Sequence, residues 1–232
     1  MSGAYPALQA ILFDLDGTLV VTSNRWSARL AHRLAPLNRV LPWLNTAALA
    51  KGLVGSTELA VTYGMLWMER LGIDSGFWGL SDRIRRSKGL ATSAASRIIP
   101  GVPQLLDELV KHYRLAVVTT RQAKEGNAFI EAAQIRRHFE TVVTRSDGWQ
   151  IKPHPGPVRL AVKRLGLAPT ACMMVGDTTL DIRSARRAGV RAVGVLTGYD
   201  TRSELERAGA EAVLGSVLEL PVYLAGLDGE GL

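Results

Sequence analysis

The chain has 232 residues, 47% apolar composition, one cysteine (Cys172) and a formal net charge of +7. This length and composition suit one large domain or two small domains with a packed core, and a lone cysteine excludes an internal disulfide. The first ten residues lack lysine and arginine, and no apolar run is long enough to span a membrane. We therefore expect a cytoplasmic protein with neither a signal peptide nor a membrane partner.

The positive charge is concentrated in one segment. Residues 20–97 contain eleven lysines and arginines against four acidic residues, whereas the rest of the chain has seventeen of each sign. Such a segment either presents a solvated basic face or attracts an anionic ligand. The sequence has no zinc-finger spacing, no single-strand-binding signature and no basic tail, so we expect no nucleic-acid partner.

The first predicted element is a buried strand over residues 9–14, and a segment of different character follows it. Residues 21–95 have Ala, Leu and Arg at helical spacing and four of the five tryptophans. Within this segment, residues 57–72 fit an amphipathic helix that ends at Gly72. We therefore predict a small helical domain, 21–95, inserted after the first strand.

From residue 96 onward, apolar strands alternate with amphipathic helices. This alternation predicts an α/β fold, a Rossmann-like parallel sheet with helices on both faces, formed by residues 1–20 and 96–232. The tail, residues 225–232, is predicted to be frayed. The further strands are predicted at 114–120, 140–145, 171–177, 191–198 and 210–215, and the helices at 124–135, 156–167, 179–190 and 201–209.

Polar residues follow the predicted strands at their carboxyl ends, where parallel sheets bind ligands. The first strand delivers two carboxylates one residue apart, which point the same way along a strand. They repel each other unless a cation, a shared proton or a chemical task accounts for them. The residues that we expect at this edge are Asp14, Asp16, Thr119, Thr120, Lys152, Asp177 and Asp181.

Each of these residues also has a purely structural interpretation when taken alone. Asp14 and Asp16 fit a turn, and Thr119 fits an ordinary helix N-cap. Lys152 fits a surface lysine before a proline turn, and Asp181 fits a first-turn acid that the helix dipole favours. Their shared position at strand ends, in this order, favours a single site.

Four motifs resemble those of the haloacid dehalogenase superfamily in the correct order: DLDGT (14–18), VVTT (117–120), KPHPGP (152–157) and GDTTLD (176–181). The resemblance covers essentially the whole chain and is strongest to the phosphoglycolate phosphatase-like branch. VVTT with Arg121 is also similar to related pyrophosphatases. The inserted helical domain is similar to the cap of that family.

The resemblance implies a Mg²⁺-dependent phosphomonoester hydrolase that acts through a phospho-aspartate intermediate. Asp14 would be the nucleophile, and Asp16 would protonate the leaving oxygen and then activate water. Thr119 would donate to a phosphoryl oxygen, and Lys152 would balance negative charge. Two departures, Val21-Thr22 in place of the usual acid and Thr120 in place of the usual asparagine, leave this chemistry untouched.

The resemblance also implies the ligands of the metal and of the phosphate. Mg²⁺ prefers oxygen ligands, which Asp14, Asp177 and the backbone carbonyl of Asp16 would provide. Asp181 would bind the metal directly or through water. The expected phosphate-binding residues are Gly17, Thr119, Thr120 and Lys152.

The function that these motifs favour is hydrolysis of a small phosphorylated metabolite, with a phosphoglycolate-like substrate preferred. The alternatives within the enzymes are a β-phosphoglucomutase-like sugar phosphomutase, a sugar phosphatase and an inorganic pyrophosphatase. Two other classes are a phospho-accepting signalling receiver, which is about half as long, and a non-catalytic binding protein, which would be expected to lose Asp14 or Asp16. The motifs leave the oligomeric state open.

Overall fold

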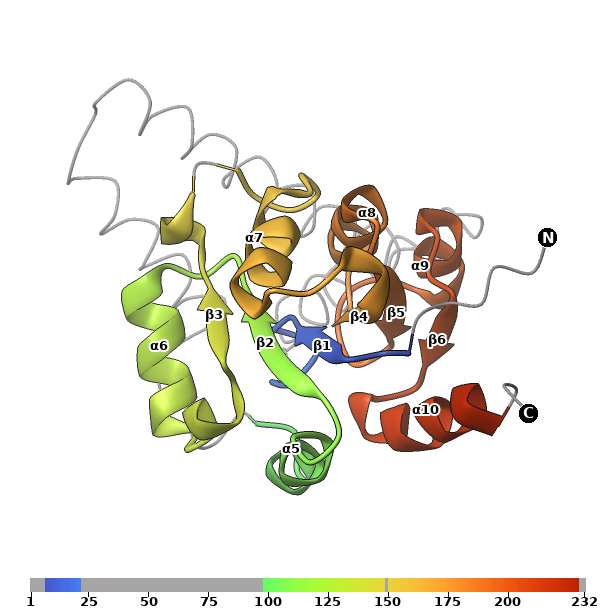
Figure 1. Cartoon of the computed structure of the whole chain (residues 1–232), viewed down its shortest axis with the longest axis horizontal. Helices are drawn as coiled ribbons and strands as arrows, with labels where there is room; N and C mark the ends of the chain where they lie inside the picture. Colours follow the sequence, from blue (N-terminus) through green and yellow to red (C-terminus); the bar gives the residue numbers. More distant parts are fainter. Residues whose placement is uncertain (1–6, 22–97, 149, 230–232) are drawn as a thin grey trace, which may run out of the picture. The chain divides into compact units, whose positions relative to one another are not determined.

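The computed structural model describes residues 7–21, 98–148 and 150–229. In this part of the chain, six strands form one sheet in the order β3-β2-β1-β4-β5-β6, and every neighbouring pair is parallel (Figure 1). The predicted α/β class is therefore confirmed. The strands are β1 (Ala10–Phe13), β2 (Arg114–Val118), β3 (Thr141–Val143), β4 (Cys172–Gly176), β5 (Arg191–Val195) and β6 (Ala212–Leu214).

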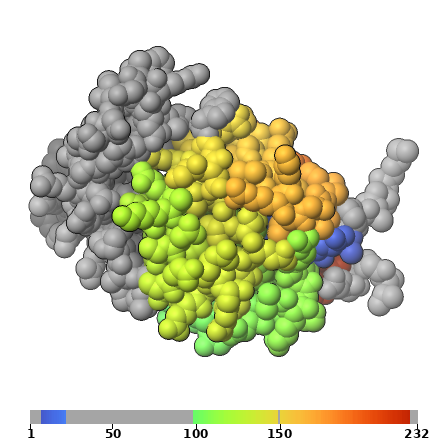
Figure 2. Space-filling model, turned by 60° about the vertical axis from the view of Figure 1, so that its left-hand side comes forward, coloured from blue at the N-terminus to red at the C-terminus, as the bar shows by residue number. Residues whose placement is uncertain are grey.

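Helices cover both faces of the sheet because successive strand residues point to opposite sides. Ile11 and Phe13 of β1 pack in the cluster that includes α5, α6 and α10, whereas Ala10 and Leu12 pack with α7, α8 and α9. Figure 2 shows the side on which α6 and the segment between β3 and α7 reach the surface. The helices are α5 (Val102–Leu109), α6 (Ala123–Ala132), α7 (Gly156–Leu165), α8 (Thr179–Ala188), α9 (Arg202–Ala208) and α10 (Leu220–Gly229). The short 3₁₀ turns are η2 (Arg136–His138), η3 (Arg145–Asp147), η4 (Pro169–Ala171) and η5 (Val217–Glu219).

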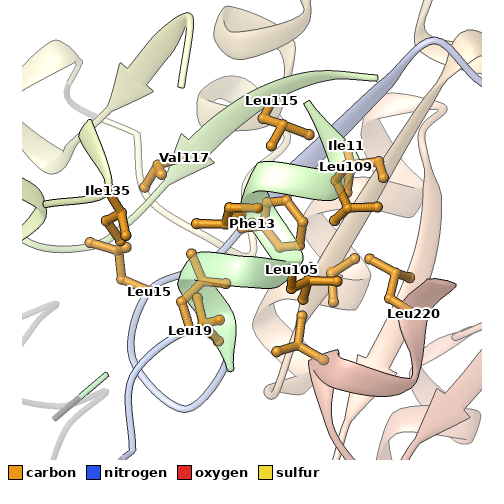
Figure 3. Close-up of a cluster of buried hydrophobic side chains, with 14 of the residues drawn as sticks. Ile11, Phe13, Leu15, Leu19, Leu105, Leu109, Leu115, Val117, Ile135 and Leu220 are labelled. Atoms are coloured by element: carbon orange, nitrogen blue, oxygen red, sulfur yellow. The ribbon is translucent and has the colours of Figure 1, made fainter. Parts of the chain in front are cut away.

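The apolar core extends beyond β1 into the turn that carries the first motif. Phe13 lies at the centre of one cluster (Figure 3). Its ring lies edge-to-face on that of Phe139, at a centroid distance of 6.5 Å. Leu15 and Leu19 are fully buried in the same cluster. The turn after β1 is thus anchored by apolar side chains, which fixes the polar residues between them.

The prediction missed two helices, α5 and α10. Proline and glycine precede or begin both segments, and these residue types are typical of loops. In α5, however, Pro103 occupies the first turn, where a proline is tolerated, and the buried leucines repeat at helical spacing. The predicted frayed tail was wrong for residues 225–229, because α10 continues to Gly229 and buries Leu224.

The predicted helical cap, residues 21–95, lies outside the described residues except for Val21, so it stays a prediction. The same holds for the amphipathic helix over 57–72. Within the described ranges, no helix combines the length and the apolar character needed to cross a membrane.

Candidate active site

The sheet brings the predicted motifs together at its carboxyl edge. β1 lies between β2 and β4, with Phe13 level with both Val117 and Val175. The three strands therefore end side by side, and Asp14, Thr119 and Asp177 are the residues that directly follow them. Asp14 still extends the pairing, because its backbone N–H donates to Val175 at 3.0 Å.

The buried ammonium of Lys152 connects three segments of the site. Its Nζ donates to Oδ1 of Asp14 at 2.7 Å, to Oδ1 of Asp181 at 2.5 Å and to the carbonyl of Val118 at 3.0 Å. These three acceptors match the three N–H donors of an ammonium group. Although burial lowers the pKa of Lys152, the carboxylates of Asp14 and Asp181 raise it above its usual value, so this group is charged.

The carboxylate of Asp14 has one oxygen held and one oxygen available. Lys152 binds Oδ1, and Oδ2 accepts no hydrogen bond from any described residue. Burial is the main cause that raises the pKa of Asp14 to about 7; Lys152 lowers it, and the charges of Asp181 and Asp16 raise it further. This side chain therefore presents a fixed, weakly hydrated oxygen to the edge of the sheet.

Asp177 and Asp181 are held by hydrogen bonds from the loops around them. Asp177 is fully buried, and it accepts from the Thr18 hydroxyl at 3.4 Å and from the Tyr199 backbone N–H at 3.1 Å. Burial, followed by the charges of Asp181 and Asp14, raises the pKa of Asp177 well above its usual range. Asp181 is the third residue of α8, where its Oδ2 closes a capping box with Thr178.

Asp14, Asp177 and Asp181 together could hold a metal ion. One carboxylate oxygen from each lies within 4.8 Å of the others, and all three side chains are buried. In the part of the chain that the structure describes, Lys152 is the one cation paired with any of these three carboxylates. Because uncompensated buried charge is strongly unfavourable, a divalent cation fits the donor set, and oxygen-only ligands suit a hard cation such as Mg²⁺.

Asp16 is not one of these three carboxylates and pairs with Arg121. Nε of Arg121 donates to Oδ2 of Asp16 at 2.7 Å, and Nη2 donates to Oδ1 at 2.5 Å. The guanidinium lies over the ring of Phe129, 4.7 Å from its centroid. In the sequence, Arg121 contributes only to the resemblance, and its pairing with Asp16 was not predicted. The pair could have been predicted from one signal in the sequence. A basic residue comes just after a strand that neighbours the strand carrying the acidic motif.

The loop after β5 closes over Asp177. Gly17, at φ +82°, and Gly198 both pass so close to Asp177 that a Cβ at either position would overlap its carboxylate. The hydroxyl of Thr197 donates to the carbonyl of Gly17 at 2.5 Å, which ties this loop to the first motif. The predicted strand over 191–198 was too long, since β5 ends at Val195. It therefore concealed Thr197 as a residue beyond the strand end.

The structure places the predicted phosphate-binding residues at the same edge without testing their role. Thr119 is buried at the end of β2, and its hydroxyl accepts from the backbone N–H of Arg121 at 3.2 Å. Thr120 is partly exposed. The phosphate contacts of Gly17, Thr119, Thr120 and Lys152 stay predictions, as does metal binding by the backbone carbonyl of Asp16.

Comparisons with known proteins agree with this arrangement. Residues 11–195 match the family model for haloacid dehalogenase-like hydrolases. The phosphoglycolate phosphatase of Escherichia coli is 26% identical over 92% of this chain and 91% of its own length. A pyrophosphatase of Bacillus velezensis is 32% identical over 85% of this chain and 88% of its own length. The crystal structure of a hydrolase from Pseudomonas syringae, 25% identical, superposes with a TM-score of 0.65 over 94% of this chain and 98% of that one. The chain therefore belongs to the haloacid dehalogenase-like hydrolase family, in its phosphoglycolate phosphatase-like branch.

The raised pKa of Asp14 predicts a pH-dependent stabilisation by Mg²⁺. Between the usual pKa of 3.8 and about 7, folded Asp14 keeps a proton that the unfolded chain has lost. The stability of the metal-free protein therefore falls as the pH rises through this window. A cation binds the ionised carboxylates and offsets that loss, so Mg²⁺ should raise the Tm more at about pH 8 than at about pH 5.

Thermal unfolding with and without Mg²⁺ at the two pH values measures this difference. Asp177→Asn removes one buried carboxylate and should reduce the increase at the higher pH. An increase in Tm that is equal at both pH values, or larger at the lower one, would contradict the prediction.

Gly17→Ala should weaken Mg²⁺ binding by at least about tenfold, roughly 1.4 kcal/mol, because the added methyl group displaces the carboxylate of Asp177. Gly166→Ala is the matched control: Gly166 also has a positive φ, +65°, but its Cβ would meet no atom within 4 Å. The control should lose about 1–2 kcal/mol of stability from backbone strain and keep its Mg²⁺ affinity. Calorimetric titration of both variants measures the effect, and equal affinities would contradict it.

Proposed function

We propose that this member of the haloacid dehalogenase-like hydrolase family is a Mg²⁺-dependent phosphomonoesterase that acts on a small phosphorylated metabolite through phospho-Asp14. The observation that carries the proposal is the geometry of Asp14. Lys152 fixes one of its oxygens, and no described residue occupies the other. A carboxylate held in this way is suited to attack phosphorus.

In the first step, Oδ2 of Asp14 attacks the phosphorus atom and the bond to the leaving-group oxygen breaks. Asp16 donates a proton to that oxygen, which makes it a better leaving group. The hydroxyl of Thr119 and the ammonium of Lys152 stabilise negative charge on the phosphoryl oxygens. The product of this step is an acyl phosphate on Asp14.

In the second step, Asp16 accepts a proton from a water molecule, which attacks the phosphorus atom of the acyl phosphate. The bond between phosphorus and the Asp14 oxygen breaks, inorganic phosphate leaves, and the carboxylate of Asp14 is restored. The same residue thus serves as acid and then as base, as its position beside the nucleophile allows.

The residues that would hold Mg²⁺ are Asp14, Asp177 and the backbone carbonyl of Asp16, with Asp181 as a direct ligand or through water. When bound, the ion neutralises charge between the carboxylates and the phosphoryl oxygens. The buried cluster supports this assignment, since Lys152, which pairs with Asp14 and Asp181, is the one cation paired with any of the three carboxylates among the described residues.

A phosphoglycolate-like substrate is the preferred choice within this function. The similarity to a phosphoglycolate phosphatase over most of both chains supports it. The excess positive charge of residues 20–97 also favours a leaving group that is itself anionic. Pyrophosphate shares that property and is the second candidate, supported by the 32% identity to a pyrophosphatase. A cytoplasmic protein without a nucleic-acid or membrane partner fits this role.

With Mg²⁺ present, we expect a higher kcat/KM for phosphate release from phosphoglycolate than from glucose 6-phosphate. Pyrophosphate is the third substrate to be tested. The reason is attraction between the basic segment and the anionic leaving group. A phosphate-release assay over the three substrates measures the order. A sugar phosphate that is the best substrate would instead favour the sugar phosphatase or the phosphomutase.

Asp14→Asn is the control that assigns the turnover to this site, and it should lose several orders of magnitude in kcat. Asp107→Asn provides the same change at an exposed position on α5 and should keep its activity. Activity in Asp14→Asn above about a tenth of the wild-type level would overturn the proposed nucleophile.

A further inference from the structure

We propose that Arg121 is a positioning residue that directs the carboxylate of Asp16 at the leaving-group oxygen, and that Phe129 holds Arg121 in place for this task. The inference rests on the proposed function, because it assigns the proton transfer to Asp16. It concerns a residue that lies outside the four motifs and whose side chain, among the described residues, pairs with Asp16 and not with Asp14, Asp177 or Asp181.

The contact between Arg121 and Asp16 fixes a direction as well as a charge. The guanidinium meets both oxygens of the carboxylate, at 2.7 and 2.5 Å, in the two-point geometry that an arginine makes and a lysine does not. Two contacts of this kind fix the plane of the carboxylate, so Arg121 sets the orientation of Asp16.

Arg121 is itself held on several sides. Its side chain is only 11% exposed, and it lies over the ring of Phe129, a buried residue of α6. Its backbone N–H donates to the hydroxyl of Thr119 at 3.2 Å, and its carbonyl accepts from the N–H of Arg145 at 2.9 Å. Burial opposes its charge, but the hydrogen bond to Asp16 and the charges of the nearby carboxylates together raise the pKa of Arg121 above its usual value.

The two carboxylates of the first motif thus have separate cations. Lys152, from the segment before α7, holds Asp14, and Arg121, from the loop after β2, holds Asp16. Two like charges one residue apart would otherwise orient by mutual repulsion. With one cation each, the nucleophile and the proton donor are held by separate hydrogen bonds.

This arrangement matters most for the first step of the proposed reaction. As the bond from phosphorus to the ester oxygen breaks and the bond to Asp14 forms, the proton of Asp16 moves to the departing oxygen. An alkoxide or phenoxide of high basicity needs that proton, whereas a weakly basic dinitrophenolate leaves without it. Loss of positioning should therefore affect poor leaving groups selectively, because proton transfer requires the donor within hydrogen-bond reach.

The test is kcat/KM of Arg121→Gln, with Mg²⁺ present, on phenyl phosphate and on 2,4-dinitrophenyl phosphate. This parameter reports only the steps through formation of phospho-Asp14, so the later hydrolysis does not obscure it. We expect a loss on the order of 10- to 100-fold with phenyl phosphate and of less than about threefold with dinitrophenyl phosphate. Arg121→Lys keeps the charge without the two-point contact and should lose an intermediate amount with phenyl phosphate.

Two further variants keep the proposal falsifiable if Arg121→Gln does not fold. Phe129→Leu keeps an apolar side chain under Arg121 and removes the aromatic face, and it should show a weaker form of the same selectivity. Arg114→Gln is the matched control, since Arg114 makes the same two-point contact with Glu140, at 2.7 and 2.5 Å, at the opposite end of β2. It should leave both substrates unaffected.

Equal losses on both substrates in the Arg121 and Phe129 variants would show a merely structural role and overturn the proposal. Faster hydrolysis of phenyl phosphate by Arg121→Gln would also overturn it, since Arg121 would then restrain Asp16 instead of directing it. Absence of phosphate release by the wild-type protein from phosphoglycolate, pyrophosphate and glucose 6-phosphate as well as from both aryl esters would refute the proposed function itself, which distinguishes that outcome from failure of the positioning role.

Discussion

The ammonium of Lys152, buried between Asp14 and Asp181, is the interaction on which the site depends. It satisfies all of its donors inside the protein and fixes one oxygen of the nucleophile that we propose. It does not balance the charge around it, because Asp177 adds a third buried carboxylate. Burial is the main cause of the raised pKa values of Asp14 and Asp177, and the charges of the neighbouring carboxylates add to this imbalance. A divalent cation resolves it, so charge balance connects the fold to the proposed chemistry.

The fold tolerates these crowded carboxylates because apolar packing beneath the site and short loops beside it hold them in place. Leu15 and Leu19 anchor the turn after β1 in the core (Figure 3). Gly17 and Gly198 let two loops approach Asp177 more closely than any side chain would permit. Preorganisation of this kind means that the carboxylates need no rearrangement when charge develops at phosphorus.

The sequence allowed the parallel sheet and most of the site to be predicted, since both follow from local patterns. Buried runs of apolar residues indicate strands, and strand ends of a parallel sheet meet at one edge, which placed Asp14, Thr119 and Asp177 together. The two-point contact of Arg121 with Asp16 could not be predicted, because it joins residues 105 positions apart through the orientation of their side chains. The loop after β5 was missed because Leu196 and Thr197 fit a strand as well as a turn. Helix α10 was missed because its glycines resemble a loop, although burial of Leu220 and Leu224 stabilises it.

The central claim, that Asp14 attacks phosphorus and water attacks the resulting acyl phosphate, is tested most directly by the stereochemistry at phosphorus. The substrate is a thiophosphate ester made chiral with one oxygen isotope, and it is hydrolysed in water that contains another isotope. Each in-line displacement inverts the configuration, so two displacements restore it. We predict overall retention of configuration in the thiophosphate product. Inversion would mean that water attacks the substrate directly, and it would contradict the proposed role of Asp14.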